Sequence, residues 1–297
     1  MLQRLKCTPK QAQLTDDPAT ILRFAVDSLE SGMGVALVTL TDIHGGASRA
    51  PGSQMAVRED GQYCGYVSGG CVESAIACEA LEVIATGRDK SVRYGQGSPW
   101  FDIVLPCGGG ITLTIHALRS CAPLRDILGS LARRESVSLI YNSSIGQLEG
   151  IASHQHTGWV EEKFAIAYHP TVRLILSGHH IEAEMTRQLA STAGYEVTDD
   201  PALMDTHSAL ILLWHDLDRE RSLLAQSRVS HPFYIGALGS ERTHQRRKAL
   251  LRECGWTENE IARITAPIGL IPKARDVRTL ALSVLADVAH ARQGLHL

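Results

Sequence analysis

The stretch VRLILSGHHIEAEMTRQLASTAGYEVTDD, residues 172–200, decides the fold class of the second half of the chain. Its opening apolar run predicts a buried strand, and the glycine after Ser177 predicts a turn. A helix and then a second strand are expected before Asp200. Strand, turn, helix and strand in this order form the repeating unit of a parallel sheet.

The segments that follow continue this alternation. SALILLWHD (208–216) predicts another buried strand, and HPFYIGALGS (231–240) predicts a strand that ends in a glycine turn. Helices are expected at 241–254 and 276–293. Strands alternating with helices favour a parallel sheet, so we expect a Rossmann-like domain here.

The first half has a mixed, α+β pattern. Asp17 followed by Pro18 is typical of an N-cap with proline at the first helical position, which predicts a helix through Glu30. The dipeptide at 60–61, Asp-Gly, predicts a hairpin turn. The other expected elements are strands at 34–43, 52–60 and 65–70, a half-buried strand at 111–118, and a helix from Cys71 to Thr86 that ends at Gly87.

The change of pattern places a domain boundary near His169-Pro170, a pair that favours extended chain. We therefore expect an α/β protein, in which an N-terminal α+β domain (1–165) is followed by a Rossmann-like parallel-sheet domain (166–297).

Composition bounds the function. The 297 residues are 44% hydrophobic and 21% charged, with a net charge of −3 and no polybasic block, so nucleic acid and anionic membranes are not expected partners. The N-terminus lacks the apolar run of a signal peptide, and no apolar run approaches the roughly 18 residues of a membrane span. Seven cysteines, an odd and scattered set, favour a reduced, cytoplasmic protein.

One cysteine follows a glycine pair. Gly69 and Gly70 precede Cys71, which we expect in the first turn of the helix. Unpaired N–H groups and the positive end of the helix dipole would favour a thiolate there. The alternative is a small buried side chain, which is the interpretation we favour for Cys78.

A second cysteine precedes glycines in IVLPCGGG (103–110). Gly108 and Gly109 can expose backbone N–H groups as an anion-binding nest beside Cys107. Arg49, in the glycine-rich stretch 44–55, could add a phosphate contact. The alternatives are a simple turn and an ordinary loop.

The second half lacks part of a dinucleotide-binding fingerprint. Gly178 is present, but His180 stands at the position of the second glycine, which normally lets the backbone approach a pyrophosphate. Asp199 and Asp200 lie about 20 residues further on, where a ribose-binding carboxylate is expected. We therefore expect weak or absent NAD(P) binding.

A second anion site is expected after the strand at 231–240. The glycine turn there opens a helix, and helix N-termini bind anions. The candidate residues are Gly236, Gly239, Ser240 and Arg242; the alternative is a solvated basic helix face. His215 and Asp216 end the preceding strand and are more typical of polar caps.

Several linked stretches resemble the xanthine dehydrogenase accessory family (XdhC/CoxI type). They are GGASRAPGSQMAVREDGQYCGYVSGGCVESAI (45–76) with LPCGGGITLTI (105–115), and YIGALGSERTHQRRKALL (234–251) with IARITAPIGL (261–270). The resemblance covers nearly the whole chain. His180 departs from it, since the family commonly has glycine there.

The resemblance implies a chaperone without turnover of its own. It would bind the molybdenum cofactor (molybdopterin or its dinucleotide form), protect it during sulfuration, and insert it into a molybdenum hydroxylase apoenzyme of the xanthine dehydrogenase or aldehyde oxidoreductase type. A cysteine desulfurase and a second copy of the chain are further expected partners. Because soft thiolates suit this metal, Cys107 is the first candidate for contact with the metal and Cys71 the second.

Two other functions compete with this one. An NAD(P)-dependent oxidoreductase using the Rossmann-like domain is the alternative, but the fingerprint lacks its second glycine. A zinc or redox protein is weaker, because no C-x-x-C occurs.

Overall fold

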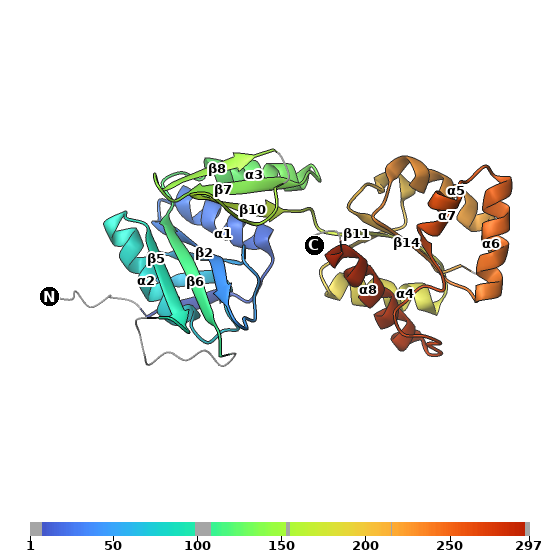
Figure 1. Cartoon of the computed structure of the whole chain (residues 1–297), viewed down its shortest axis with the longest axis horizontal. Coiled ribbons are helices and arrows are strands. Elements are labelled where there is room, and N and C mark those ends of the chain that lie inside the picture. Colours follow the sequence, from blue (N-terminus) through green and yellow to red (C-terminus); the bar gives the residue numbers. More distant parts are fainter. Residues whose placement is uncertain (1–7, 99–107, 153–154, 215, 295–297) are drawn as a thin grey trace. The chain divides into compact units, whose positions relative to one another are not determined.

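The computed structural model describes residues 8–98, 108–152, 155–214 and 216–294. The chain folds into two compact units, Met1–His169 and Pro170–Leu297 (Figure 1). Each unit has its own sheets and its own hydrophobic core.

The N-terminal unit is built on a six-stranded sheet in the order β1-β4-β3-β2-β6-β5. Its neighbouring strands are antiparallel except for β1 and β4, which are parallel. The strands are β1 (Lys10–Gln13), β2 (Val35–His44), β3 (Gln54–Arg58), β4 (Gln62–Gly65), β5 (Lys90–Gly95) and β6 (Gly110–Ala117).

A second, antiparallel sheet of this unit has the order β8-β7-β10-β9. Its strands are β7 (Val137–Asn142), β8 (Gln147–Ile151), β9 (Gly158–Val160) and β10 (Lys163–Tyr168), and the helices of the unit are α1 (Pro18–Glu30), α2 (Glu73–Thr86) and α3 (Ala122–Ala132). Side chains of α2 pack on one face of the six-stranded sheet, whereas α1, α3 and the second sheet pack on the other.

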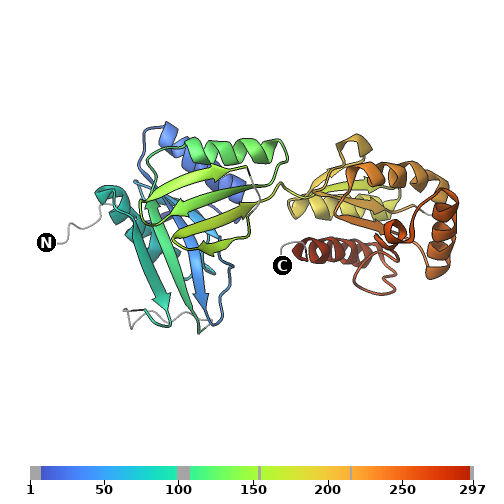
Figure 2. The ribbon, with the colours of Figure 1, turned by 45° about the horizontal axis from the view of Figure 1, so that its top comes forward.

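The C-terminal unit is a parallel sheet in the order β12-β11-β13-β14-β15 with helices on both faces (Figure 2). One core contains α4 and α8, and the other contains α5, α6 and α7. The elements are β11 (Arg173–Ser177), α4 (Ile181–Thr192), β12 (Glu196–Thr198), the short 3₁₀ helix η1 (Pro201–Leu203), β13 (Ser208–Leu212), α5 (Leu217–Ser230), β14 (Tyr234–Ala237), α6 (Glu241–Glu253), α7 (Glu258–Ala262), β15 (Ile264–Thr265) and α8 (Val277–Gln293).

The predicted fold class is confirmed: an α+β unit precedes a Rossmann-like parallel sheet. The helix after Asp17 is also confirmed, because the Asp17 side chain accepts a hydrogen bond from the Thr20 N–H and the helix ends at Glu30. The Asp60-Gly61 turn joins two antiparallel strands as expected, with Gly61 at a φ of 84°.

Three local predictions were wrong. The strand expected at 65–70 lies instead at Gln62–Gly65, and residues 66–72 form an irregular loop. The helix expected from Cys71 begins at Glu73, with Val72 as its N-cap. The strand expected to be half-buried, β6, is buried along almost its whole length, because one face joins the core beneath α2 and, on the other face, His116 packs against Tyr141 of β7.

Among the described residues, no helix is long and apolar enough to cross a membrane.

A buried ion pair fastens two helices of the C-terminal unit. The Arg247 guanidinium on α6 donates to both carboxylate oxygens of Glu220 on α5, at 2.6 and 3.0 Å. It also donates to the Leu238 carbonyl at 2.9 Å, just after β14. Both charged side chains are at most 2% exposed, so each depends on the other for solvation.

Glu220→Ala should therefore lower the free energy of unfolding by about 3–5 kcal/mol, because it leaves a buried guanidinium without its carboxylate. Chemical denaturation followed by circular dichroism measures the change. The matched control is Glu258→Ala, which removes the exposed carboxylate 2.6 Å from Arg252 Nε and should change little. Equal stability of the two variants would contradict the assigned role of the pair.

Candidate functional site

Three loops meet at one end of the six-stranded sheet. Strand β2 ends at His44, which pairs with Gly110 at the start of β6. At the same end β4 finishes at Gly65, opposite Met55 near the start of β3. The chain segments 45–53, 66–72 and 108–109, here called the glycine loops, therefore lie at a common edge.

Close backbone approach explains one glycine of these loops. A side-chain carbon on Gly109 would lie 2.1 Å from the Gly46 carbonyl oxygen, so only glycine fits there. Gly69 lies against the loop of residues 45–53, since a side-chain carbon on it would meet Ser48 Oγ at 3.3 Å. The structure thus brings together the predicted residues Gly69 and Gly109 with the loop that carries Arg49.

Two other glycines leave open space. Gly70 has a φ of 96° and Gly108 a φ of 70°, a region that favours glycine. A side chain added at either position would meet no atom of the described residues within 4 Å. Their backbones are therefore accessible to a ligand.

Cys71 lies in the loop before α2 rather than in its first turn. It is exposed, and its Sγ lies 3.7 Å from Ser68 Oγ. The buried Cys64 contrasts with it, because desolvation raises the pKa of the Cys64 thiol to about 11 and keeps it neutral. Cys78 is partly buried. Among the described cysteines of this unit, Cys71 is the most accessible thiol.

A buried carboxylate holds the Cys71 loop in place. Glu73 is 1% exposed, and its carboxylate accepts hydrogen bonds from the Ser68 N–H at 2.8 Å and the Ser68 hydroxyl at 2.7 Å. The N–H groups of Val67 and Val72 contribute longer bonds, both of 3.3 Å. Sequence reasoning missed this residue, although an acidic side chain in a helix's first turn is a known signal for bonding to preceding N–H groups.

Arg49 already has protein partners. Its guanidinium lies 2.6 Å from Asp16 Oδ2 and 5.8 Å from the centre of the Tyr66 ring. These residues border a cavity of about 220 Å³. Arg49 belongs to the glycine loop 45–53 and Tyr66 to the glycine loop 66–72, so their contact joins the two loops, and Arg49 remains one-third exposed.

Cys107, the first candidate for metal contact, lies outside the described residues, as does His215. The next residue, Gly108, is the first described position of that loop. Within the described ranges, no three His, Cys, Asp or Glu side chains are grouped so that they could hold a metal ion.

In the C-terminal unit, an aromatic side chain lies at the carboxyl edge of the sheet. Trp214 follows β13, and its indole N–H donates to Ser177 Oγ at the end of β11, at 2.6 Å. The His179 ring lies edge-on at 4.3 Å between centroids, and the Arg219 guanidinium lies 4.4 Å from the indole centre. These side chains gather at the edge where open α/β sheets bind ligands.

The loop after β11 differs from a dinucleotide loop. A side-chain carbon on Gly178 would lie 2.9 Å from Ala183 Cβ, so this glycine permits close packing of α4. His180 is the extended N-cap residue of α4, 6.2 Å from Trp214 between ring centroids. Asp200 caps the short helix η1 through the Ala202 N–H.

The residues predicted around α6 occupy two different environments. Ser240 is the N-cap of α6 and accepts from the Thr243 N–H, while Gly239, Ser240 and Arg242 lie at the surface. Gly236 lies inside β14, where a side-chain carbon would meet Ile268 Cδ1 at 2.4 Å. The first three can face a ligand at the helix N-terminus, and Gly236 serves packing.

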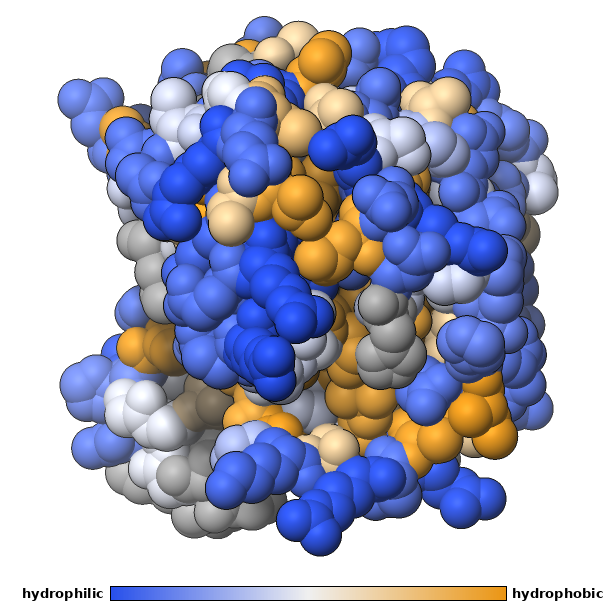
Figure 3. Space-filling model, turned by 90° about the vertical axis from the view of Figure 1, so that its right-hand side faces the viewer, coloured by the Kyte–Doolittle hydropathy of each residue, from blue (hydrophilic) through white to orange (hydrophobic). Residues whose placement is uncertain are grey.

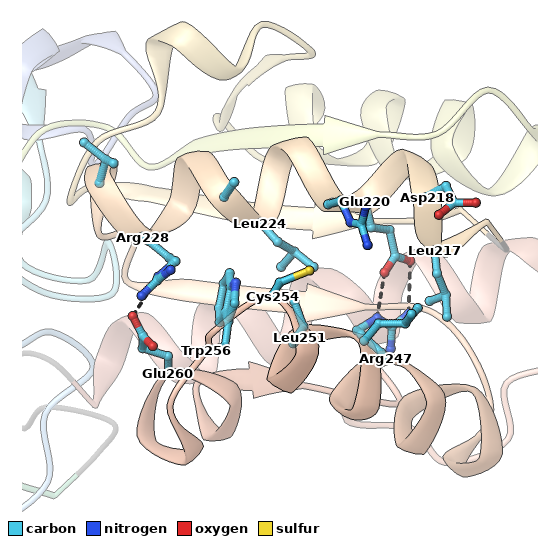
Figure 4. Close-up of a pocket in the computed structure, with 14 residues that line it drawn as sticks. Leu217, Asp218, Glu220, Leu224, Arg228, Arg247, Leu251, Cys254, Trp256 and Glu260 are labelled. Carbon is cyan, nitrogen blue, oxygen red and sulfur yellow. Dashed lines mark hydrogen bonds and ion pairs between the residues drawn. The ribbon is translucent and has the colours of Figure 1, made fainter.

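Sequence reasoning also missed a cavity of about 560 Å³ between α5 and α6 (Figure 4). The buried Glu220–Arg247 pair lies at one end, and Arg228 with Glu260 (2.8 Å) at the other. Leu224, Leu251, Cys254 and Trp256 are among the residues between them. The space-filling view shows apolar residues exposed within a largely polar surface (Figure 3).

Known proteins share both halves of this architecture. Residues 28–95 match the XdhC and CoxI family, and residues 159–288 match the XdhC Rossmann domain. A crystal structure described as a xanthine dehydrogenase from Bacillus halodurans has the same fold, with a TM-score of 0.73 at 20% identity over 92% of this chain and 96% of that chain.

One relative that is matched over almost its full length identifies the family of the chain. The chain is 53% identical to the Molybdenum cofactor insertion chaperone PaoD of Escherichia coli strain K12, over 96% of this chain and 92% of that protein. It is 25% identical to the uncharacterized protein YqeB of the same strain, over 89% of this chain and 44% of that protein. The chain therefore belongs to the XdhC and CoxI family.

The carboxyl edge of the C-terminal sheet generates a prediction about nucleotides. His180 and the Trp214 group should obstruct a pyrophosphate, so the wild type should show no saturable heat with NAD or NADP in titration calorimetry. His180→Gly is the variant in which a gain is expected first. Micromolar binding by the wild type would contradict this prediction.

The Glu73 network generates another prediction. Glu73→Ala should cost about 1–3 kcal/mol of stability, because it removes a buried acceptor from the Ser68 N–H and hydroxyl. It should also change the alkylation rate of Cys71 measured by mass spectrometry. Glu82→Ala, an exposed carboxylate on the same helix, is the control and should alter neither quantity. An unchanged alkylation rate in Glu73→Ala would rule out the assigned role.

Proposed function

We propose that this protein binds the molybdenum cofactor as cargo and inserts it into a molybdoenzyme. The observation that carries the proposal is the 53% identity to a molybdenum cofactor insertion chaperone over almost the full length of both chains. In the proposed role the protein does not catalyse a reaction of its own.

The glycine loops supply chemistry that suits this cargo. The cofactor carries a phosphate and a metal bound by two sulfur atoms, and thiolates are suitable ligands or neighbours for such a metal. Cys71 offers an exposed sulfur, and Gly70 and Gly108 offer open backbone. We assign the metal contact first to Cys107 and second to Cys71. We assign the phosphate to Gly69, Gly70, Gly108 and Gly109, with Arg49 as a further contact.

The C-terminal unit offers a second place for an anionic part of the cargo. Gly239 and the N-cap residue Ser240 directly precede α6, whose N-terminus favours a phosphate, and Arg242 adds an exposed positive charge. We propose that these residues, with Gly178 and Gly236 shaping the adjacent strands, contact the cofactor or the nucleotide of its dinucleotide form.

The finer parts of the role are also proposals. The client would be a xanthine dehydrogenase or aldehyde oxidoreductase type apoenzyme, and the bound cofactor would receive its terminal sulfur with the help of a cysteine desulfurase. We propose a homodimer that acts in the cytoplasm, which fits the reduced cysteines expected from the sequence.

The test is cofactor retention by cysteine variants. Cys107→Ala should lose most of the molybdenum cofactor that co-elutes with the wild type in gel filtration, and Cys71→Ala should lose part of it, because each removes a sulfur near the metal. Molybdenum analysis and pterin fluorescence measure the cargo, and circular dichroism checks the fold.

Two thiol controls accompany these variants. Cys254→Ala removes an exposed thiol of the other unit, and Cys78→Ala removes a partly buried one; both should retain the cofactor. Equal retention by wild type and Cys107→Ala would refute the assignment to Cys107 and leave Cys71 as the candidate. Failure of the wild type to retain any cofactor would refute the proposed function itself.

A further inference from the structure

A second cavity of the N-terminal unit lies away from the glycine loops. It has a volume of about 500 Å³ and lies between the end of β6, the start of α3 and the β7–β8 hairpin. Strand β6 is labelled in Figure 1; it begins at Gly110, beside the glycine loops, and His116 near its other end lines this cavity. Gly110 and His116 are six strand residues apart, a distance of about 20 Å, so the cavity is separate from the glycine loops.

The buried side chain of His116 forms part of the cavity wall, and it is paired with the partly buried Asp89 behind it. His116 is 5% exposed, and its Nδ1 lies 2.7 Å from Asp89 Oδ2. The same carboxylate oxygen accepts the Tyr141 hydroxyl at 2.8 Å, and Oδ1 accepts the Ala117 N–H at 3.1 Å. Burial alone would raise the pKa of Asp89, but the bonds from His116 and Tyr141 outweigh it and hold the pKa below its usual value. The charged carboxylate therefore holds the proton on Nδ1.

The other imidazole nitrogen is left for a ligand. No described side chain is bonded to His116 Nε2, and no fully buried side-chain nitrogen or oxygen among the described residues lacks a partner. Nε2 is therefore not fully enclosed, and His116 is among the residues that line this cavity. There it can accept a hydrogen bond from a protonated acid group or, once protonated, donate one to an anion.

The mouth of the cavity adds positive charge. Arg119 lines it with an exposed side chain, and no carboxylate is among its described lining residues. The N-terminus of α3 also faces it through Ser120, Ala122 and Pro123; the Ser120 hydroxyl accepts the Ala122 N–H at 3.1 Å and can donate its own proton to an anion. A helix N-terminus and an arginine both favour a negatively charged group.

The β7–β8 hairpin supplies apolar side chains to the remaining wall. Ile145 and Leu148 line the cavity there together with Gly146 and Gln147, and Ile145 is 61% exposed. An occupant that used the whole cavity would need an acid group at one end and an apolar body at the other. A cavity of this size accommodates small organic molecules.

We propose that this cavity, the His116 pocket, binds a small organic anion whose phosphate or carboxylate contacts His116 Nε2, Arg119 and the start of α3, and whose apolar body contacts Ile145 and Leu148. The proposal is independent of cofactor binding at the glycine loops. It gives the N-terminal unit a second ligand, bound at the other end of β6.

The test is titration calorimetry of the full chain with four probes. Phenyl phosphate should bind most tightly, inorganic phosphate more weakly, and phenol should not bind. Benzoate in place of phenyl phosphate distinguishes a carboxylate site from a phosphate site. Saturable binding of phenol equal to that of phenyl phosphate, or no saturable binding of any anion, would overturn the proposal.

Variants locate the binding. Arg119→Gln should weaken phenyl phosphate about tenfold, the loss of one charge-assisted hydrogen bond. Ile145→Ala should weaken phenyl phosphate but leave inorganic phosphate unchanged. The matched control is Arg23→Gln, which removes an exposed arginine of α1 in the same unit. Equal affinities of Arg119→Gln and Arg23→Gln would overturn the assignment.

His116→Gln tests the pair of His116 and Asp89. If this variant fails to fold, the exposed variants Arg119→Gln and Ile145→Ala still test the proposal. A folded His116→Gln protein should bind phenyl phosphate more weakly and should retain the molybdenum cofactor as the wild type does. Unchanged phenyl phosphate binding in that variant would remove His116 from the site. Loss of cofactor retention would show that the two sites are one.

Discussion

A close approach of two backbones governs the candidate site of the N-terminal unit. The Gly109 and Gly46 backbones touch where β6 begins and β2 ends, and no side chain could stand between them. This contact holds two glycine loops against each other, and Glu73 holds the third through Ser68. An exposed thiol and open backbone are thus presented from a rigid edge rather than from independent loops.

The two units differ in how side chains cover the sheet edge at which a ligand could bind. The N-terminal unit leaves its loop backbone uncovered at Gly70 and Gly108, whereas the C-terminal unit gathers Trp214, His179 and Arg219 at the edge that would otherwise accept a dinucleotide. The parallel sheet is therefore retained while the usual approach to a pyrophosphate is altered. A shared fold does not carry a shared ligand, because the ligand depends on the side chains at the edge.

Much of this arrangement could be predicted from sequence, where the signal was local. The Asp17-Pro18 cap fixed the start of α1, and βα alternation identified the parallel sheet. The shift of α2 from Cys71 to Glu73 could not be predicted, because it depends on the folded loop that Glu73 stabilises. The Asp89–His116–Tyr141 group joins residues up to 52 positions apart, so no spacing in the sequence indicates it.

The burial of strand β6 on both faces limits the insertions and deletions that this fold can accept. The strand has Ile115 in the core beneath α2 and His116 turned toward Asp89. Deleting or inserting one residue within it would exchange the two faces, placing an imidazole in an apolar core. Such length changes should be tolerated better in β2. The pairing of β2 with β6 already shifts register between Leu40 and Asp42, so β2 accommodates an extra residue there and the pairing continues beyond it.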